Sequence, residues 1–206
     1  GHTLRLLKKE SDWYLVQTAY RYIGWITESS FVNIDSMGME KWRTAVKVKV
    51  CELFPLIFSL PDENSEPVSD VVLNAILKFE SAKEGWNQVS LPDGRTGFIR
   101  IKHISSDLSV QKSPEELRSD IVKTSRKMMG IPYLWGGNSS KGNDCSGFTQ
   151  NVFRANGIEL PRDSRQQALV GQRIAANDSF SNVLPGDLLF FGSKERVTHV
   201  GVSLGG

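Results

Sequence analysis

The sequence contains little cysteine. Only Cys51 and Cys145 occur among its 206 residues, and neither belongs to a C-x-x-C pair. This argues against a zinc knuckle and against a thioredoxin-like redox motif, whereas a disulfide between the two cysteines stays open. The sequence shows no other cluster of metal ligands, so we expect neither a metal nor another cofactor.

Long apolar runs and a strong net charge are also absent. No run reaches the roughly 18 residues that a membrane-spanning helix requires. The formal net charge is +2, so charge alone predicts no binding to nucleic acid or to an anionic membrane. Hydrophobic residues at 39% and charged residues at 23% are typical of a folded globular chain.

The N-terminal half contains an internal repeat. Trp13 recurs as Trp86, and the tripeptide GWI at 24–26 recurs as GFI at 97–99. Each copy reads as two alternating strands around a turn, and the second turn, Pro92–Arg95, contains the Pro-Asp-Gly sequence of a hairpin. Short strands with one tryptophan per unit predict small β-barrels.

The repeated pattern, W-x-x-V followed by G-[WF]-I, resembles the bacterial SH3 domain. By this resemblance, residues 39–107 are a complete SH3-like barrel and residues 1–38 are a partial one. The partial copy lacks residues equivalent to those at the start of the second copy. We therefore expect the sequence to be a piece of a longer protein. Both modules are interpreted as spacers or wall-binding units without chemistry of their own.

The two copies differ at the tips of their hairpins. The first copy carries Tyr20 and Tyr22 where the second carries Pro92–Arg95. Exposed aromatic side chains at a turn are unfavourable in water unless they contact something. Two roles stay open for Tyr22: packing against a neighbouring domain, or forming one wall of a binding site.

The character of the sequence changes at Ser113. Ser113 followed by Glu116 is typical of a helix start, and apolar residues continue at helical spacing through Leu117 and Ile121 to Met128 and Met129. We therefore expect a linker over residues 108–112 and a new domain over residues 113–206.

Cys145 follows a polar, glycine-rich loop over residues 136–143. After it, Phe148, Val152 and Ala155 recur at helical spacing, which places Cys145 in the first turn of a helix. The unpaired N–H groups and the helix dipole at this end favour a thiolate over a thiol and can bind an oxyanion. Cys145 is therefore the candidate nucleophile.

A cysteine nucleophile needs a base, and the chain has three histidines. His2 lies at the very start of the sequence and His103 near the end of the second module. His199 lies in the alternating segment 197–202, with Val200 on one face and the imidazole on the other. Together with the segment 187–191 it predicts a hairpin. The alternative for His199 is a strand-edge histidine without a catalytic role.

Five blocks in the second half resemble the NlpC/P60 family of cell-wall cysteine peptidases. They are residues 132–137 (PYLWGG), 144–148 (DCSGF), 160–167 (LPRDSRQQ), 184–191 (LPGDLLFF) and 199–202 (HVGV). The resemblance implies a papain-like α+β fold in which Cys145 attacks a carbonyl, His199 carries the proton, and Tyr133 with the Cys145 N–H stabilises the oxyanion. The family's third catalytic residue is expected beyond Gly206.

With SH3-like modules in front, the architecture resembles the dipeptidyl-peptidase VI subgroup. This implies cleavage of the γ-D-glutamyl–diamino acid bond in murein peptides with a free N-terminal L-Ala. A buried ammonium needs a carboxylate partner, for which Asp163 is the candidate, although it could instead cap a helix. The resemblance implies six further substrate-contacting residues: Tyr22, Trp135, Asp144, Ser146, Gly147 and Ser164.

Two other functions stay open: a hydrolase of intact peptidoglycan stems, and a wall-binding protein without activity. The intact Cys145 and His199 favour an enzyme over the second of these. We expect a monomer in the bacterial envelope, periplasmic or secreted, with a cytoplasmic location as the alternative. The choice between diaminopimelate and lysine stays open.

Overall fold

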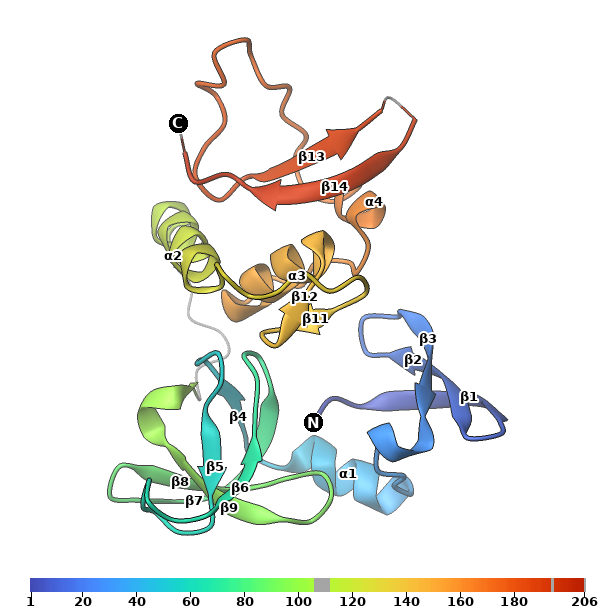
Figure 1. Cartoon of the computed structure of the whole chain (residues 1–206), viewed down its shortest axis with the longest axis vertical. Coiled ribbons are helices and arrows are strands. Elements are labelled where there is room, and N and C mark those ends of the chain that lie inside the picture. The colour runs from blue at the N-terminus through green and yellow to red at the C-terminus, as the bar shows by residue number, and fades with distance from the viewer. Residues whose placement is uncertain (106–111, 194, 206) are drawn as a thin grey trace. The chain divides into compact units, whose positions relative to one another are not determined.

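The computed structural model describes residues 1–105, 112–193 and 195–205. The chain divides into two compact units, Gly1–Asp107 and Leu108–Gly206, each of which is drawn in Figure 1. The predicted linker 108–112 lies outside the described residues except for Lys112. The boundaries predicted at residues 38/39 and 113 stay predictions.

The first unit opens with a three-stranded antiparallel sheet. Its strands, in the order β1-β2-β3, are β1 (Leu4–Glu10), β2 (Trp13–Thr18) and β3 (Ile23–Thr27). The 3-10 helix η1 (Glu28–Ser30) and α1 (Ser36–Thr44) follow. The two paired strands predicted around the Tyr20–Tyr22 turn are confirmed as β2 and β3.

The rest of the first unit is a seven-stranded antiparallel sheet in the order β10-β4-β7-β8-β9-β5-β6. Its elements are β4 (Lys47–Val50), β5 (Leu56–Phe58), β6 (Pro67–Asp70), β7 (Ile76–Lys83), β8 (Trp86–Ser90), β9 (Thr96–Arg100), η2 (Ile101–His103) and β10 (Ile104–Ser105). Six buried aliphatic side chains form its core: Val48, Val50, Ile57, Leu77, Val89 and Ile99. Among the described residues no pairing joins β6 to β10, so small antiparallel sheets are present but the predicted SH3-like barrels are not confirmed.

The repeat is visible in the structure, but only its second copy builds a full core. Trp86 is 4% exposed and meets Phe58 of β5 edge to face, with ring centroids 5.9 Å apart. Its counterpart Trp13 is 50% exposed. The first sheet, within the described residues, has no strands equivalent to β5 and β6. Trp13 and Trp86 therefore occupy equivalent positions in the repeat, but only Trp86 is buried.

Gly97→Ala is expected to destabilise the second sheet by about 1–3 kcal/mol, the usual effect of overpacking. A Cβ at this position would lie 2.5 Å from Ile57 Cγ2 and 2.7 Å from the Phe58 carbonyl oxygen. Gly24→Ala is the matched control, since a Cβ at the equivalent position of the first copy has nothing within 4 Å. Urea unfolding followed by tryptophan fluorescence measures both variants. Equal midpoints would contradict the close packing of β5 on β9.

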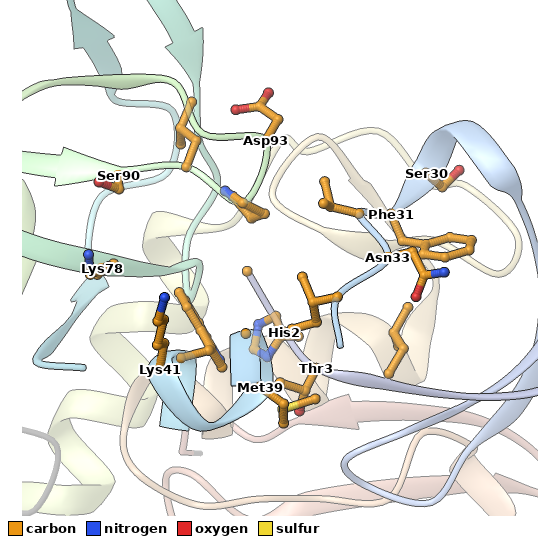
Figure 2. A pocket seen from close by; sticks show the side chains of 18 of the residues that line it. His2, Thr3, Ser30, Phe31, Asn33, Met39, Lys41, Lys78, Ser90 and Asp93 are labelled. Carbon is orange, nitrogen blue, oxygen red and sulfur yellow. The ribbon is translucent and has the colours of Figure 1, made fainter. Parts of the chain in front are cut away.

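A cavity of about 770 Å³ lies within the first unit. Figure 2 shows side chains that line it. Its wall is formed by β1, the segment 29–34, α1 and the turn between β8 and β9. Phe31, Met39 and Trp42 give it an apolar lining, to which Lys41 and Asp93 add opposite charges. None of the residues predicted to bind or cleave a substrate lines this cavity.

The second unit is an α+β domain. Its elements are α2 (Pro114–Lys127), β11 (Asn138–Ser139), β12 (Gly142–Asn143), α3 (Cys145–Ala155), α4 (Ser164–Gln167), β13 (Leu188–Gly192) and β14 (Val197–Val202). The pairs β11–β12 and β13–β14 are antiparallel. α3 packs against α2, β11 and β14 (Figure 1). In the part of the chain that the structure describes, no helix is long and apolar enough to cross a membrane.

The predicted start of α2 is confirmed. The Glu116 N–H donates to Ser113 Oγ at 3.2 Å, and the Ser113 N–H donates to the Glu116 carboxylate at 2.9 Å, which is a capping box. In the apolar stripe, Met128 is 1% exposed but Met129 is 71% exposed. The inclusion of Met129 was therefore wrong, because it follows the end of the helix, where the chain turns at Gly130 (φ 85°).

The buried face of α3 is more polar than its apolar spacing predicts. Val152 is fully buried, and so are Gln150 and, nearly, Asn151. The Gln150 amide donates to the Leu160 carbonyl at 2.7 Å, and the Asn151 amide donates to Asn138 Oδ1 at 2.9 Å. Because these side chains have partners, their burial costs little. The bonds join α3 to the segments before and after it.

Candidate active site

Cys145 is the first residue of α3 and is half-buried. Asp144 precedes it, and the carboxylate of Asp144 accepts a 2.7 Å hydrogen bond from the Gly147 N–H, which caps the helix. The first N–H groups of a helix have no partner within it, so they can serve a ligand at this end. The predicted position of Cys145 at a helix start is confirmed.

Tyr133 lies beside the first turn of α3. A parallel bridge pairs it with Asn143, and the Leu134 N–H donates to the Asn143 carbonyl at 3.1 Å. The Tyr133 side chain lies near Cys145 and is 62% exposed. Desolvation of the phenol, followed by its electrostatic interactions with Cys145 and Asp144, raises the pKa of Tyr133. The hydroxyl therefore stays protonated at neutral pH and can donate a hydrogen bond.

A buried ion pair lies at the start of α3. Arg162 donates to both carboxylate oxygens of Asp144, at 3.0 and 2.7 Å, and also to the Ser146 hydroxyl at 2.9 Å. Arg162 is 7% exposed and Asp144 is 9% exposed. Burial acts to raise the pKa of Asp144, but hydrogen bonds from Arg162 and from backbone N–H groups outweigh it. The pKa of this carboxyl therefore lies below its usual value.

Three residues predicted to contact a substrate already have close contacts within the domain. The Ser146 hydroxyl lies 3.2 Å from an oxygen of Asp144. A Cβ at Gly147 would collide with the Gly137 carbonyl oxygen, so glycine permits the close approach of the preceding loop to α3. The predicted contact of Asp144, Ser146 and Gly147 with a substrate stays a prediction.

His199 lies on β14 with its side chain exposed. Because α3 packs against β14, the helix that begins at Cys145 and the strand that carries His199 are neighbours (Figure 1). The predicted hairpin is confirmed, with Phe191 of β13 opposite His199 and their ring centroids 6.0 Å apart. Val200 is 2% exposed and lies on the opposite face of the strand. The role of His199 as a base stays a prediction.

Asp163 occupies the N-cap position of α4, yet its side chain makes no capping hydrogen bond. Its backbone carbonyl accepts instead from the N–H groups of Gln166 and Gln167, each at 2.9 Å. Asp163 and Ser164 are both half-buried. The predicted position of Asp163 at the start of a helix is confirmed, but its carboxylate does not cap that helix.

Trp135 and Tyr22 are exposed residues of different units. Trp135 is 87% exposed in the loop before β11. Tyr22 is 38% exposed at the end of the β2–β3 turn, and its ring centroid lies 6.5 Å from that of Tyr20. Tyr22 belongs to the first unit and Cys145 to the second. The predicted contacts of Tyr22 and Trp135 with a substrate stay predictions.

Arg162 and Gln167 are site residues that sequence reasoning did not single out. Gln167 is fully buried; its amide donates to the carbonyls of Ser146 at 3.1 Å and Pro161 at 2.9 Å, and its oxygen accepts from the Thr149 hydroxyl at 2.8 Å. Both residues lie in the quoted block 160–167, but a charged or amide residue there predicts an exposed side chain. Only their partners on α3 explain their burial.

Both cysteines are free thiols, Cys51 exposed and Cys145 half-buried, so the disulfide that the sequence left open is not formed. Among residues 1–105, 112–193 and 195–205, no group of three or more His, Cys, Asp or Glu side chains could hold a metal ion. The expectation of a site without metal or cofactor stays a prediction.

Comparison with known proteins identifies the second unit. Residues 130–206 match the NlpC/P60 family. This part of the chain is an NlpC/P60 domain. The matched residues include Cys145, Tyr133 and His199.

Three relatives extend the similarity beyond the NlpC/P60 domain. The γ-D-glutamyl-L-lysine dipeptidyl-peptidase of Bacillus subtilis is 36% identical over 69% of this chain and 46% of its own length. Dipeptidyl-peptidase 6 of Lysinibacillus sphaericus is 28% identical over 96% of this chain and 75% of its own length. The crystal structure of an NlpC/P60 family protein from Bacillus cereus matches all of this chain and 68% of that one, with a TM-score of 0.81 and 26% identity.

The chain spans only part of the length of these relatives. It covers 46% of the Bacillus subtilis peptidase and 63% of the γ-D-glutamyl-L-lysine dipeptidyl-peptidase of Bacillus cereus. The similarity to the second of these extends over the whole chain at 27% identity. Both units therefore have counterparts in proteins named as dipeptidyl-peptidases.

Proposed function

We propose that the protein is a cysteine peptidase that hydrolyses the bond between the γ-carboxyl of D-Glu and a diamino acid in murein peptides with a free N-terminal L-Ala. The observation that carries the proposal is the placement of Cys145 at the N-terminus of α3, next to the strand-like bridge that brings Tyr133 beside Asn143. Relatives named γ-D-glutamyl-L-lysine dipeptidyl-peptidase support the substrate class.

The chemistry follows from the first turn of α3 and the strand beside it. The Cys145 sulfur attacks the γ-carbonyl carbon as the thiol proton passes to His199. The new oxyanion accepts hydrogen bonds from the Cys145 N–H and the Tyr133 hydroxyl. Collapse breaks the C–N bond, and His199 returns the proton to the leaving amine. Water activated by His199 then hydrolyses the thioester and restores the thiol.

The N-terminal ammonium of the peptide pairs in this proposal with Asp163. The carboxylate of Asp163 makes no capping bond and follows directly on the buried Arg162. A charged partner offsets the desolvation of an ammonium. Ser164 adds a hydrogen bond, and the exposed Trp135 gives an apolar wall.

Asp163→Asn is expected to raise the KM for free-amine peptides by a factor equivalent to about 1–3 kcal/mol, because the ammonium loses a charge-assisted hydrogen bond. Initial rates over a range of peptide concentrations measure the change. Asp178→Asn, an exposed aspartate between α4 and β13, is the matched control and keeps the parental KM. If Asp163→Asn also keeps it, Asp163 does not bind the amine.

The demand for a free amine is tested by comparing L-Ala-γ-D-Glu-L-Lys with its N-acetylated form. We expect cleavage of the free-amine peptide and little of the acetylated one, since acetylation removes the charge that Asp163 binds. Equal cleavage of both would instead favour a hydrolase that acts on intact wall stems. A monomeric state and a location in the bacterial envelope remain part of the proposal, and diaminopimelate in place of lysine is tested with the corresponding peptide.

A further inference from the structure

We infer that Arg162 and Gln167 are positioning residues that fix the distance between Cys145 and Asp163, and that this distance limits how many residues can precede the cleaved bond. The inference rests on the proposed function, in which Cys145 attacks the carbonyl and Asp163 binds the N-terminal ammonium. It assigns the selection of peptide length to two side chains that touch neither reacting group.

Arg162 ties the residue next to Asp163 to the start of the nucleophile's helix. Its guanidinium bonds both oxygens of Asp144 and the hydroxyl of Ser146, the two residues on either side of Cys145. It also donates to the Gly137 carbonyl at 3.2 Å. At 7% exposure these are buried, charge-assisted bonds with a planar geometry, which resist displacement more than apolar packing does.

Gln167 makes a second tie on the other side of Asp163. Its amide nitrogen donates to the Ser146 carbonyl in α3 and to the Pro161 carbonyl, and its oxygen accepts from Thr149. The side chain is fully buried, and all of these partners lie within the same domain. The segment 161–167 is therefore bonded to the first turns of α3 at both of its ends.

Asp163 lies between these two ties. Its carbonyl accepts from the Gln167 N–H at 2.9 Å, so the backbone at Asp163 is coupled to the second tie as well as to the first. Ser146 is shared by both, through its hydroxyl with Arg162 and its carbonyl with Gln167. The nucleophile and the proposed amine site are thus held in one buried polar network (α3 and α4 in Figure 1).

A fixed distance discriminates between peptides by length. Each added residue moves the ammonium by up to about 3.5 Å along an extended chain. A peptide with one extra N-terminal residue therefore cannot pair its ammonium with Asp163 and also present the same carbonyl to Cys145. A shift of about 1 Å in such a site can lower the rate roughly 100-fold. The network consequently favours two residues before the cleaved bond.

The test compares kcat/KM for L-Ala-γ-D-Glu-L-Lys and for Gly-L-Ala-γ-D-Glu-L-Lys in the full chain and two variants. Arg162→Lys keeps the charge but loses the planar fork. Gln167→Asn shortens the second tie and leaves the ion pair intact. The matched controls are Arg165→Lys and Gln166→Asn, which change exposed residues of α4. Thermal unfolding establishes that each protein is folded.

We expect both variants to lower kcat/KM for L-Ala-γ-D-Glu-L-Lys by roughly 100-fold. The ratio of kcat/KM between this peptide and the one extended by Gly should narrow by about tenfold, while the controls keep the parental ratio. Folded variants that keep the parental ratio overturn the inference even if their overall rate falls. If Arg162→Lys does not fold, Gln167→Asn decides. A parent chain that cleaves neither peptide overturns the proposed function instead.

Discussion

Cys145→Ala is expected to lower turnover of γ-D-glutamyl peptides by about 10⁴-fold or more, because it removes the sulfur that forms the thioester in the proposed reaction. The side chain is half-buried at the first position of α3, and the alanine that replaces it is a good helix former. The fold and its unfolding temperature should therefore change little. Initial rates from liquid chromatography and a thermal melt measure the two effects.

Cys51→Ala is the matched control for the nucleophile. Cys51 is an exposed free thiol in the first unit, and its thiol lies 3.7 Å from the Lys102 carbonyl. The variant is expected to keep the parental rate. Retained activity in Cys145→Ala, or lost activity in Cys51→Ala with the fold intact, would contradict the assignment of the nucleophile.

Asp144→Asn is expected to destabilise the second unit by about 3–5 kcal/mol, because it leaves the buried Arg162 without its counter-charge. The pair is bidentate, and both members are less than 10% exposed. Asp93→Asn is the contrasting control, since its pair with Arg95 is exposed and such pairs contribute about 0–1 kcal/mol. Urea unfolding at pH 7 measures both. Similar midpoints for the two variants would contradict a stabilising role for the buried pair.

The same ion pair predicts a dependence of stability on pH. The pKa of Asp144 is lower in the folded chain than its usual value. Burial alone would raise this pKa, but the hydrogen bonds from Arg162 outweigh that effect. Its contribution to stability is therefore present above the ordinary carboxyl pKa of about 4 and is lost as the pH falls through the lower folded value. Unfolding midpoints between pH 7 and pH 3 should fall more for the parent than for Asp144→Asn.

Local patterns predicted the parts of the site that depend on nearby residues. The helix start at Cys145, the capping box at Ser113 and the hairpin around His199 are each encoded within a few positions. Caps, turn residues and strand alternation act over such distances. The positions of these helix starts and of this hairpin were therefore predictable from a single sequence.

Contacts between distant residues were not predictable in the same way. Arg162 lies 18 positions from Asp144, and the Arg162 side chain reads as exposed until its partners are known. The polar face of α3 has the same origin, since Gln150 is buried only because the Leu160 carbonyl accepts its hydrogen bond. The exposure of Trp13 against the burial of Trp86 depends on strands outside the repeated motif. The spacing of apolar residues predicts which face of a helix or strand is buried, but not which residues pack against that face.

The most direct test of the proposed function is to identify the products formed from L-Ala-γ-D-Glu-L-Lys by mass spectrometry. The geometry at Cys145 and Asp163 predicts two products, the dipeptide L-Ala-γ-D-Glu and free lysine, with neither formed by Cys145→Ala. Release of free alanine, an intact peptide after prolonged incubation, or the same products from Cys145→Ala would contradict it.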